Sequence, residues 1–206
     1  MAVTTVFSDL PVEFIGSFPD PRHPLVPPLP ELIFLGRSNV GKSSLINALA
    51  GRRIAKTSGT PGKTQFLNAF RFPGFYLIDL PGYGYAKLAR TERGRLRKLV
   101  KDVIATRSGH GAVVWLLDIR HPPSEDDLAM ADLLADAGRE TVIVLTKGDK
   151  LSQAQRHAAT RARADDLGLD SDDLLLTSSA KGFGIAELAR HLDEATRDPN
   201  LGRGAR

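Results

Sequence analysis

The chain lacks cysteine altogether and has no long uninterrupted apolar stretch. Zero cysteines among 206 residues exclude a disulfide framework and any metal site or nucleophile built on thiolate. No apolar run approaches the roughly 20 residues that span a bilayer, and the first residues show no basic-then-apolar signal pattern. The 42% apolar and 25% charged content is typical of a globular protein. We therefore expect one compact domain, soluble and cytoplasmic, with no membrane partner.

Proline is concentrated near the beginning of the chain, where six prolines fall within residues 19–30. Such a segment can form neither a helix nor a central strand. We expect residues 1–30 to be an extended Pro-rich arm, residues 31–197 to be the folded domain, and the basic tail 198–206 to be disordered. The sequence shows no internal repeat and no second domain.

The strongest motif is a glycine-containing loop that follows the apolar run 32–35. It reads G-x-x-x-x-G-K-S and leads into a helical segment, so backbone N–H groups in the turn can point at phosphates. Lys42 is expected to meet the β- and γ-phosphates and Ser43 to ligate Mg²⁺. The loop residues expected to bind nucleotide are Gly36, Arg37, Ser38, Asn39, Val40, Gly41, Lys42 and Ser43. The alternative is a glycine-rich turn with an incidental lysine.

A second apolar strand, 75–78, runs into Asp79-Leu80-Pro81-Gly82. A strand parallel to the first places Asp79 beside the phosphate loop. There the carboxylate can hold a Mg²⁺-bound water, and the Gly82 N–H can face a γ-phosphate. Alone, the pattern Asp-x-x-Gly is usually a turn, but behind a phosphate loop it is a strong second element.

Two further loops, each after an apolar strand, are suited to bind a purine base. Thr146-Lys147-Gly148-Asp149 follows strand 141–145. Asp149 can accept two hydrogen bonds from the N1–H and the amine of guanine, which adenine does not offer. The loop Ser178-Ser179-Ala180 follows strand 173–176, and a backbone N–H there can reach the guanine O6. The sequence therefore favours GTP over ATP.

These four elements in this order match the small GTPase pattern, and their detailed sequences resemble one family within it. The resemblance is carried by 36–47, Thr60-Pro61-Gly62-Lys63-Thr64-Gln65, 79–87, 118–122 and 146–150. Over about residues 30–195 the chain resembles the YihA/EngB/YsxC family of bacterial ribosome-assembly GTPases, in the translation-factor-related class. The resemblance implies a GTPase that acts in assembly of the large ribosomal subunit and is required for normal growth and division. Thr146 stands where most GTPases carry Asn, and Gly148 is a small, flexible residue, so we expect weaker guanine affinity.

Apolar runs and helical stretches alternate along the domain. We predict strands at 32–35, 66–72, 75–78, 112–117, 141–145 and 173–176, and helices at 43–50, 92–106, 124–137, 152–166 and 184–197. The Pro73-Gly74 pair reads as a hairpin turn that gives one antiparallel edge strand. The prediction is a three-layer α/β P-loop GTPase fold, with a mostly parallel six-stranded sheet and the nucleotide at its carboxyl edge.

The polar loop 52–64 is predicted to be the first switch. Its end and the following strand entry supply further expected nucleotide contacts, namely Gly62, Lys63, Thr64, Gln65 and Phe66. Thr64 is the candidate for contacting Mg²⁺ and the γ-phosphate, and the alternative is an ordinary strand-entry residue. The expected catalytic residues are Lys42, Thr64 and Gly82. The expected metal ligands are Ser43, Thr64 and Asp79.

After Gly82, where many regulatory GTPases carry a water-orienting glutamine, this chain has Tyr83. A phenol is a poor substitute for a carboxamide that must donate and accept at the attacking water. We therefore expect slow intrinsic hydrolysis, with a partner or a potassium ion completing the site. His121 follows strand 112–117, and a loop-ordering role is favoured over a catalytic one because nothing in the sequence places it near a phosphate.

Residues 87–107 contain eight basic and two acidic side chains, a local charge of +6 against +4 for the whole chain. A helix so basic can meet RNA phosphates, although such a charge run is also typical of a solvated helix face. The leading hypothesis is a monomeric GTPase that binds the large ribosomal subunit precursor and its rRNA, not DNA. The alternatives are a regulatory GTPase with a protein effector of division or stress, and a phosphate-loop metabolic kinase. The kinase hypothesis does not account for the segment Thr146–Asp149, which is suited to bind guanine.

Overall fold

The computed structural model describes residues 4–56, 66–84, 90–107 and 111–197. The sheet contains β1 Glu13–Phe18, β2 Glu31–Gly36, β3 Leu67–Phe72, β4 Phe75–Asp79, β5 Val113–Asp118, β6 Thr141–Thr146 and β7 Leu174–Leu176. The helices are α1 Lys42–Leu49, α2 Arg90–Thr106, α3 Glu125–Ala137, α4 Gln153–Leu167 and α5 Ile185–Thr196, with short 3₁₀ turns η1 Gly148–Lys150 and η2 Ser171–Asp173. Each strand and helix predicted from the sequence is present within two residues of its expected ends. None of the helices in the described ranges is long and apolar enough to cross a membrane.

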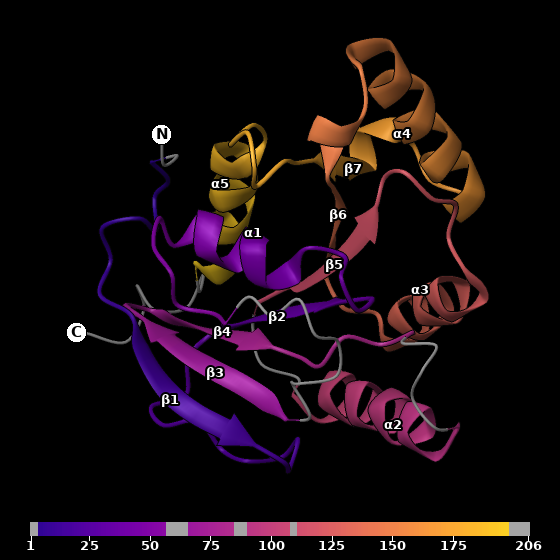
Figure 1. Ribbon diagram of the computed structural model, residues 1–206. Coiled ribbons are helices and arrows are strands. Elements are labelled where there is room, and N and C mark those ends of the chain that lie inside the picture. Colours follow the sequence, from indigo (N-terminus) through magenta and orange to yellow (C-terminus); the bar gives the residue numbers. More distant parts are fainter. Residues whose placement is uncertain (1–3, 57–65, 85–89, 108–110, 198–206) are drawn as a thin grey trace.

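The strands form one sheet in the order β1-β3-β4-β2-β5-β6-β7 (Figure 1). Strands β4, β2, β5, β6 and β7 pair in parallel, and β3 runs antiparallel to both of its neighbours, β1 and β4. The predicted α/β fold is confirmed, with two corrections. The sheet has seven strands instead of six in the described residues, and the antiparallel strand β3 is second from the edge because β1 covers it.

Strand β1 comes from the segment that we expected to be an extended arm. It pairs with β3 and contains a bulge between Phe14 and Gly16. Phe14 is 57% exposed, yet its ring lies 5.4 Å from that of Phe70. Farther toward the N-terminus, the Phe7 ring is buried in the core. Residues 4–18 therefore pack against the domain and protect the edge that β3 would otherwise expose.

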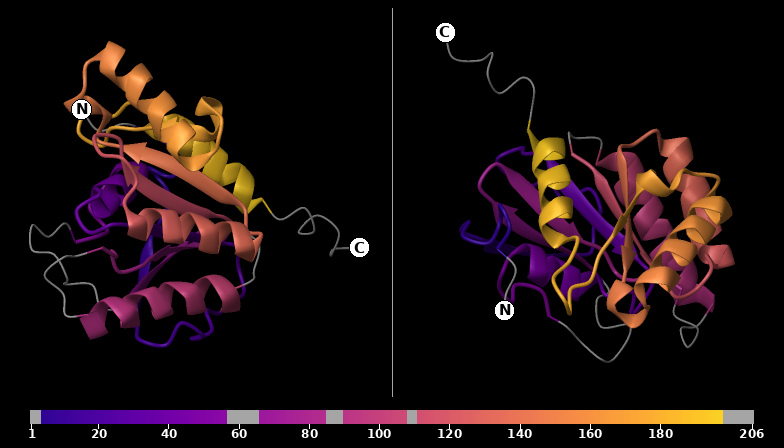
Figure 2. Two further views of the ribbon diagram at one scale, coloured as in Figure 1. Left: turned by 90° about the vertical axis from the view of Figure 1, so that its right-hand side faces the viewer. Right: turned by 90° about the horizontal axis from the view of Figure 1, so that it is seen from above.

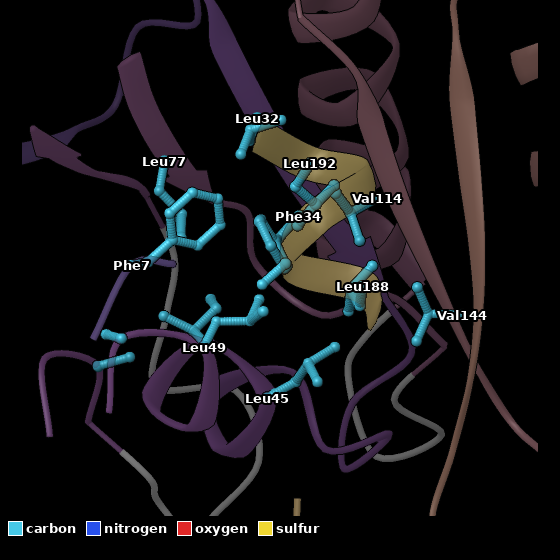
Figure 3. Packing of buried hydrophobic residues seen from close by; sticks show 14 of the residues in the cluster. Phe7, Leu32, Phe34, Leu45, Leu49, Leu77, Val114, Val144, Leu188 and Leu192 are labelled. Atoms are coloured by element: carbon cyan, nitrogen blue, oxygen red, sulfur yellow. The ribbon is translucent and has the colours of Figure 1, made fainter. Parts of the chain in front are cut away.

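The sequence of β2 is a continuous apolar run because both faces of this strand are buried. Leu32 and Phe34 face one core, and Ile33 and Leu35 face the other, because successive side chains alternate across a sheet. Helices α1 and α5 cover the first face, where Leu45, Leu49, Leu188 and Leu192 meet Phe34 (Figure 3). Helices α2 and α3 cover the second face, so the sheet lies between two helical layers (Figure 2).

The C-terminal end of the basic segment is anchored to the N-terminal arm by Arg107. Its Nε donates to the Pro21 carbonyl at 2.9 Å, and its other guanidinium nitrogens bond to the His23 carbonyl and to Glu31, at 2.5 and 2.6 Å. Arg107 is buried. It is therefore unable to contact RNA, contrary to the charge count from the sequence.

Candidate functional site

The loops that follow β2, β4, β6 and β7 all leave the sheet at its carboxyl edge, because these strands are parallel. This edge is where α/β sheets bind ligands. The structure therefore brings together the described parts of all four sequence motifs: the phosphate loop 36–43, the segment 79–82, and the loops 146–149 and 178–180.

The phosphate loop needs glycine at both ends for different reasons. A Cβ on Gly36 would lie 2.9 Å from the Leu116 carbonyl oxygen, so the loop could not pass so close to β5. Gly41 has φ 107°, a conformation that L side chains rarely adopt, and it starts α1 without a side-chain cap. The first backbone N–H groups of α1 are therefore left available for an anion.

Lys42 and Asp79 form a buried ion pair between the phosphate loop and the end of β4. Their side chains are 9% and 4% exposed. Ser43 lies next to Lys42 in the first turn of α1 and is half-buried. Ser43 in α1 and Asp79 at the end of β4 are the two described residues expected to bind a metal. The Lys42 ammonium, also in α1, is paired with the Asp79 carboxylate.

Gly82 lies directly against the phosphate loop. A Cβ added to it would be 2.9 Å from the Ser38 nitrogen, so the position accommodates only glycine without a shift. The Ser38 hydroxyl donates to the Gly82 carbonyl at 3.2 Å, and the Ser38 N–H donates to the Tyr83 carbonyl at 2.8 Å. The Tyr83 N–H in turn donates to the Gly36 carbonyl at 3.2 Å. These backbone bonds extend the pairing of β2 and β4 into the two loops.

The Tyr83 side chain points into the protein and not toward the loops. Its ring is 3% exposed. Its hydroxyl accepts a hydrogen bond from Trp115 Nε1 at 2.7 Å and donates one to Asp127 at 2.9 Å. Burial, together with the Asp127 carboxylate, raises the pKa of the Tyr83 phenol well above its ordinary value. Tyr83 therefore cannot take the place of a water-orienting glutamine, as its chemistry had also indicated.

Thr146, which stands where most GTPases carry Asn, joins the base loop to the phosphate loop. Its buried hydroxyl lies 2.7 Å from the Val40 carbonyl and 3.1 Å from the Leu117 carbonyl. Next to it, Lys147 Nζ donates to the Asn39 carbonyl at 2.6 Å and pairs with Asp118 at 2.9 Å. Partial burial alone would raise the pKa of Asp118, but hydrogen bonds from Arg120 and Lys147 lower it to about 2.

Asp149 and Ser178 connect the two loops expected to hold the base. The Ser178 hydroxyl donates to the Asp149 carboxylate at 2.7 Å. This bond is the main cause of a lowered pKa for Asp149, with Lys150 adding to it. Gly148 is closely packed, because a Cβ on it would lie 2.8 Å from the Phe183 ring. Ser179 and Ala180 lie in the turn that follows, with Ala180 exposed.

The other expected residues are less informative. Gly62, Lys63, Thr64 and Gln65 lie outside the described residues, and Phe66 is 44% exposed at the entry to β3. Leu80 and Pro81 are buried.

His121 is exposed and lines a cavity of about 250 Å³ shared with the phosphate-loop residues 37–40, so it is closer to the loop than the sequence indicated. The sequence analysis missed Trp115, Arg156 and Phe183, which no local motif marks, and Asp127, whose place in the capping box of α3 gave no sign of its contact with Tyr83.

The fold and the arrangement of these loops define a phosphate-loop GTPase, an enzyme that binds and hydrolyses GTP. A family model described as "50S ribosome-binding GTPase" matches residues 31–147. The chain is 42% identical over 196 residues to a probable GTP-binding protein EngB of Chlorobium luteolum, covering 94% of this chain and 91% of that protein. A second such protein, from Chlorobium phaeobacteroides, is 46% identical over 80% of this chain and 86% of its own. The chain belongs to the EngB family of GTPases.

Solved structures agree on the fold. A crystal structure of a probable GTP-binding protein EngB superposes with a TM-score of 0.68 and 22% identity, covering 81% of this chain and 98% of that one. Era in complex with MgGDPNP and nucleotides 1506–1542 of 16S ribosomal RNA superposes with a TM-score of 0.62 and 18% identity, covering 82% of this chain and 57% of that one. At these identities the likeness concerns the fold alone.

Proposed function

We propose that this GTPase acts in assembly of the large ribosomal subunit, by binding a precursor particle through its rRNA in a manner that depends on the bound nucleotide. The observation that carries the proposal is the exposed basic surface of α2, which starts six residues after Gly84. Arg95, Arg97, Lys98 and Lys101 are all exposed on this helix. The description of the matched family model names 50S ribosome binding, which supports the same partner.

The basic surface of α2 is not equally available along its length. Arg97 pairs with Asp126 at the start of α3, which leaves Arg95, Lys98 and Lys101 as the cations without an acidic partner in the described contacts. These three residues follow one another at spacings of three, so they lie on one side of the helix. A phosphate backbone is a suitable partner because the surface presents charge without stacking aromatic side chains.

In the proposed GTP site each motif has a distinct task. The first N–H groups of α1 and Lys42 hold the β- and γ-phosphates, and the Gly82 N–H senses the γ-phosphate. Ser43 and Asp79 offer hard oxygen atoms, the donor type that Mg²⁺ takes, and a single carboxylate suits an ion that keeps waters and phosphate oxygens as its other ligands. When bound, Mg²⁺ supplies charge neutralisation at the phosphates. Asp149 accepts from guanine, and the 178–180 loop faces its O6.

Hydrolysis is proposed to be slow without a partner. Tyr83 is buried and bonded to Trp115 and Asp127, so its hydroxyl is not available to orient the attacking water. Thr64 is proposed to complete the metal and γ-phosphate contacts from the first switch. A group supplied by the particle, or a potassium ion, would then complete the site in place of the missing water-orienting glutamine.

The test is cosedimentation with large subunits at rising potassium chloride, with a GTP analogue bound. Neutralised phosphates release counterions, so three contacts predict that a threefold rise in salt weakens binding roughly 10- to 20-fold. Changing Arg95, Lys98 and Lys101 together to Glu is expected to abolish cosedimentation while GTP affinity stays within a factor of two. A matched control changes Arg22, Arg161 and Arg190, which are equally exposed on other surfaces, to Glu.

The two variants separate the possible partners. If both charge-reversed proteins pellet like the unmodified one and salt has little effect, the α2 surface does not contact RNA. If no particle binds in either nucleotide state, the ribosomal proposal fails and a protein effector of division or stress becomes the better candidate.

A further inference from the structure

The two loops that are proposed to hold guanine are clamped from outside by a pair of side chains that no motif includes. Arg156 lies in the first turns of α4, and Phe183 lies in the loop before α5. The Arg156 guanidinium stands over the Phe183 ring, 4.6 Å from its centroid. Neither residue is part of the Thr146–Asp149 or Ser178–Ala180 segments.

Arg156 holds the carbonyl groups on both sides of Asp149. Its Nε lies 2.7 Å from the Gly148 carbonyl oxygen and 3.1 Å from that of Leu151. Hydrogen bonds from a guanidinium to carbonyls are stronger than those between neutral groups. The single Nε–H is shared between the two carbonyls, so Arg156 contacts the backbone on both sides of the Asp149 carboxylate.

Phe183 holds the same turn from the other loop. Its ring fills the space above Gly148, so that a Cβ there would be 2.8 Å from the ring and 3.0 Å from Leu176. Its carbonyl accepts from the Ser178 N–H at 3.0 Å. Phe183 thus contacts the turn that carries Asp149 with its side chain and the loop that carries Ser178 with its backbone.

We propose that Arg156 and Phe183 are positioning residues for guanine recognition, which set the separation of Asp149 from the 178–180 loop. They act through the Gly148 carbonyl and the Ser178 backbone and touch no part of the nucleotide. The proposal rests on the assignment of Asp149 to guanine made above, and it is independent of the ribosomal partner.

This role has a signature that a general loss of stability would not give. Guanine offers Asp149 two donors, the N1–H and the exocyclic amine, whereas hypoxanthine offers only the N1–H. Displacement of the carboxylate by a few tenths of an ångström therefore weakens GTP more than ITP. A change that only destabilises the fold lowers both affinities by the same factor.

The experiment compares GTP and ITP affinities by calorimetry for two variants of α4. Arg156→Met keeps the length of the side chain and removes its donors. We expect it to weaken GTP about tenfold, which is ~1.4 kcal/mol, and ITP about threefold or less. Arg161→Met is the matched control, since Arg161 lines the same groove of about 480 Å³ as Arg156 and is exposed. It should leave both affinities unchanged.

The Phe183 side of the clamp is tested in the same way. Phe183→Leu, which removes the ring from the space over Gly148, should lower the ratio of GTP to ITP affinity. The proposal would be overturned if Arg156→Met or Phe183→Leu lowered the affinities for GTP and ITP by the same factor. It would also be overturned if either variant bound GTP as tightly as the unmodified protein. Asp149→Asn separates this result from failure of the guanine site: if it too leaves GTP binding unchanged, Asp149 does not contact the base.

Discussion

The buried contacts of Tyr83 predict that removing one oxygen atom costs the protein a large part of its stability. Tyr83→Phe deletes the acceptor of Trp115 Nε1 and the donor to Asp127, at 2.7 and 2.9 Å in the structure. Both partners are buried, with 1% and 2% of their surface exposed. The Ser124 amide and hydroxyl still satisfy the other oxygen of Asp127, at 2.9 and 2.7 Å.

The size of the effect follows from what is left unpaired. A buried donor without a partner costs about 1–3 kcal/mol, and a hydrogen bond to a charged acceptor contributes about 1.5–3 kcal/mol. The extra apolar character of phenylalanine offsets part of this loss. We therefore expect the free energy of unfolding to fall by about 2–4 kcal/mol, and the melting temperature to fall by roughly 5–12 °C for a domain of this size.

Urea titration followed by tryptophan fluorescence measures this loss at the site itself, because Trp115 is the single tryptophan of the chain. The matched control is Tyr76→Phe, in which the hydroxyl of an equally buried ring bonds to the Pro27 carbonyl of the arm at 3.1 Å. That variant should lose at most about 1 kcal/mol, as expected for a neutral hydrogen bond. If Tyr83→Phe and Tyr76→Phe unfold at the same urea concentration, the hydrogen bonds of the Tyr83 hydroxyl to Trp115 and Asp127 do not contribute the predicted stability.

Two further predictions concern buried and half-buried charges. Lys42→Ala should destabilise the protein by about 3 kcal/mol in urea titration without nucleotide, because it leaves the buried Asp79 carboxylate unpaired; a variant as stable as the unmodified chain would show that the pair contributes nothing. Asp118→Asn should cost about 1 kcal/mol at pH 6, a value discounted from the pKa shift because the carboxyl is partly solvated. The pKa of Asp118 is lowered from 3.8 to about 2, so its contribution is complete above about pH 5 and is lost as the pH falls through 2. A gap in urea midpoint between Asp118→Asn and the unmodified protein that stays constant from pH 6 to pH 2 would contradict this assignment.

The parts of the fold that were predictable are those in which one physical pattern dominates. The run Leu32–Leu35 is apolar at every position because both faces of β2 are buried, and this pattern is readable without any neighbour. The ends of α3 are equally readable, since Ser124 forms a capping box and Gly138 takes the left-handed conformation. Local rules of this kind fixed the element boundaries to within two residues.

Strand β1 and the orientation of side chains were not predictable, for different reasons. In β1 the bulge at Gly16 interrupts the alternation, and Phe14 faces outward, so no period-two pattern exists to be read. The direction of the Tyr83 ring depends on Trp115 and Asp127, which lie 32 and 44 residues away in the chain. The burial of Arg107 likewise depends on carbonyls of the arm, more than 80 residues earlier.

The same long-range contacts explain how Thr146 can stand in this chain where most GTPases carry asparagine. What the position must do is tie the base loop to the phosphate loop, and a short hydroxyl at 2.7 Å from the Val40 carbonyl does so without a longer side chain. Lys147 makes a second tie, to the Asn39 carbonyl at 2.6 Å, and the Ser38 N–H joins the phosphate loop to the Tyr83 carbonyl at 2.8 Å. These ties use backbone carbonyls as acceptors, whereas Lys42 and Asp79 pair through the two side chains that the proposed binding of Mg²⁺ and GTP engages, so that pair must rearrange. Each of these charges then exchanges a protein partner for a ligand partner, which lets the site change occupancy without leaving either charge buried alone.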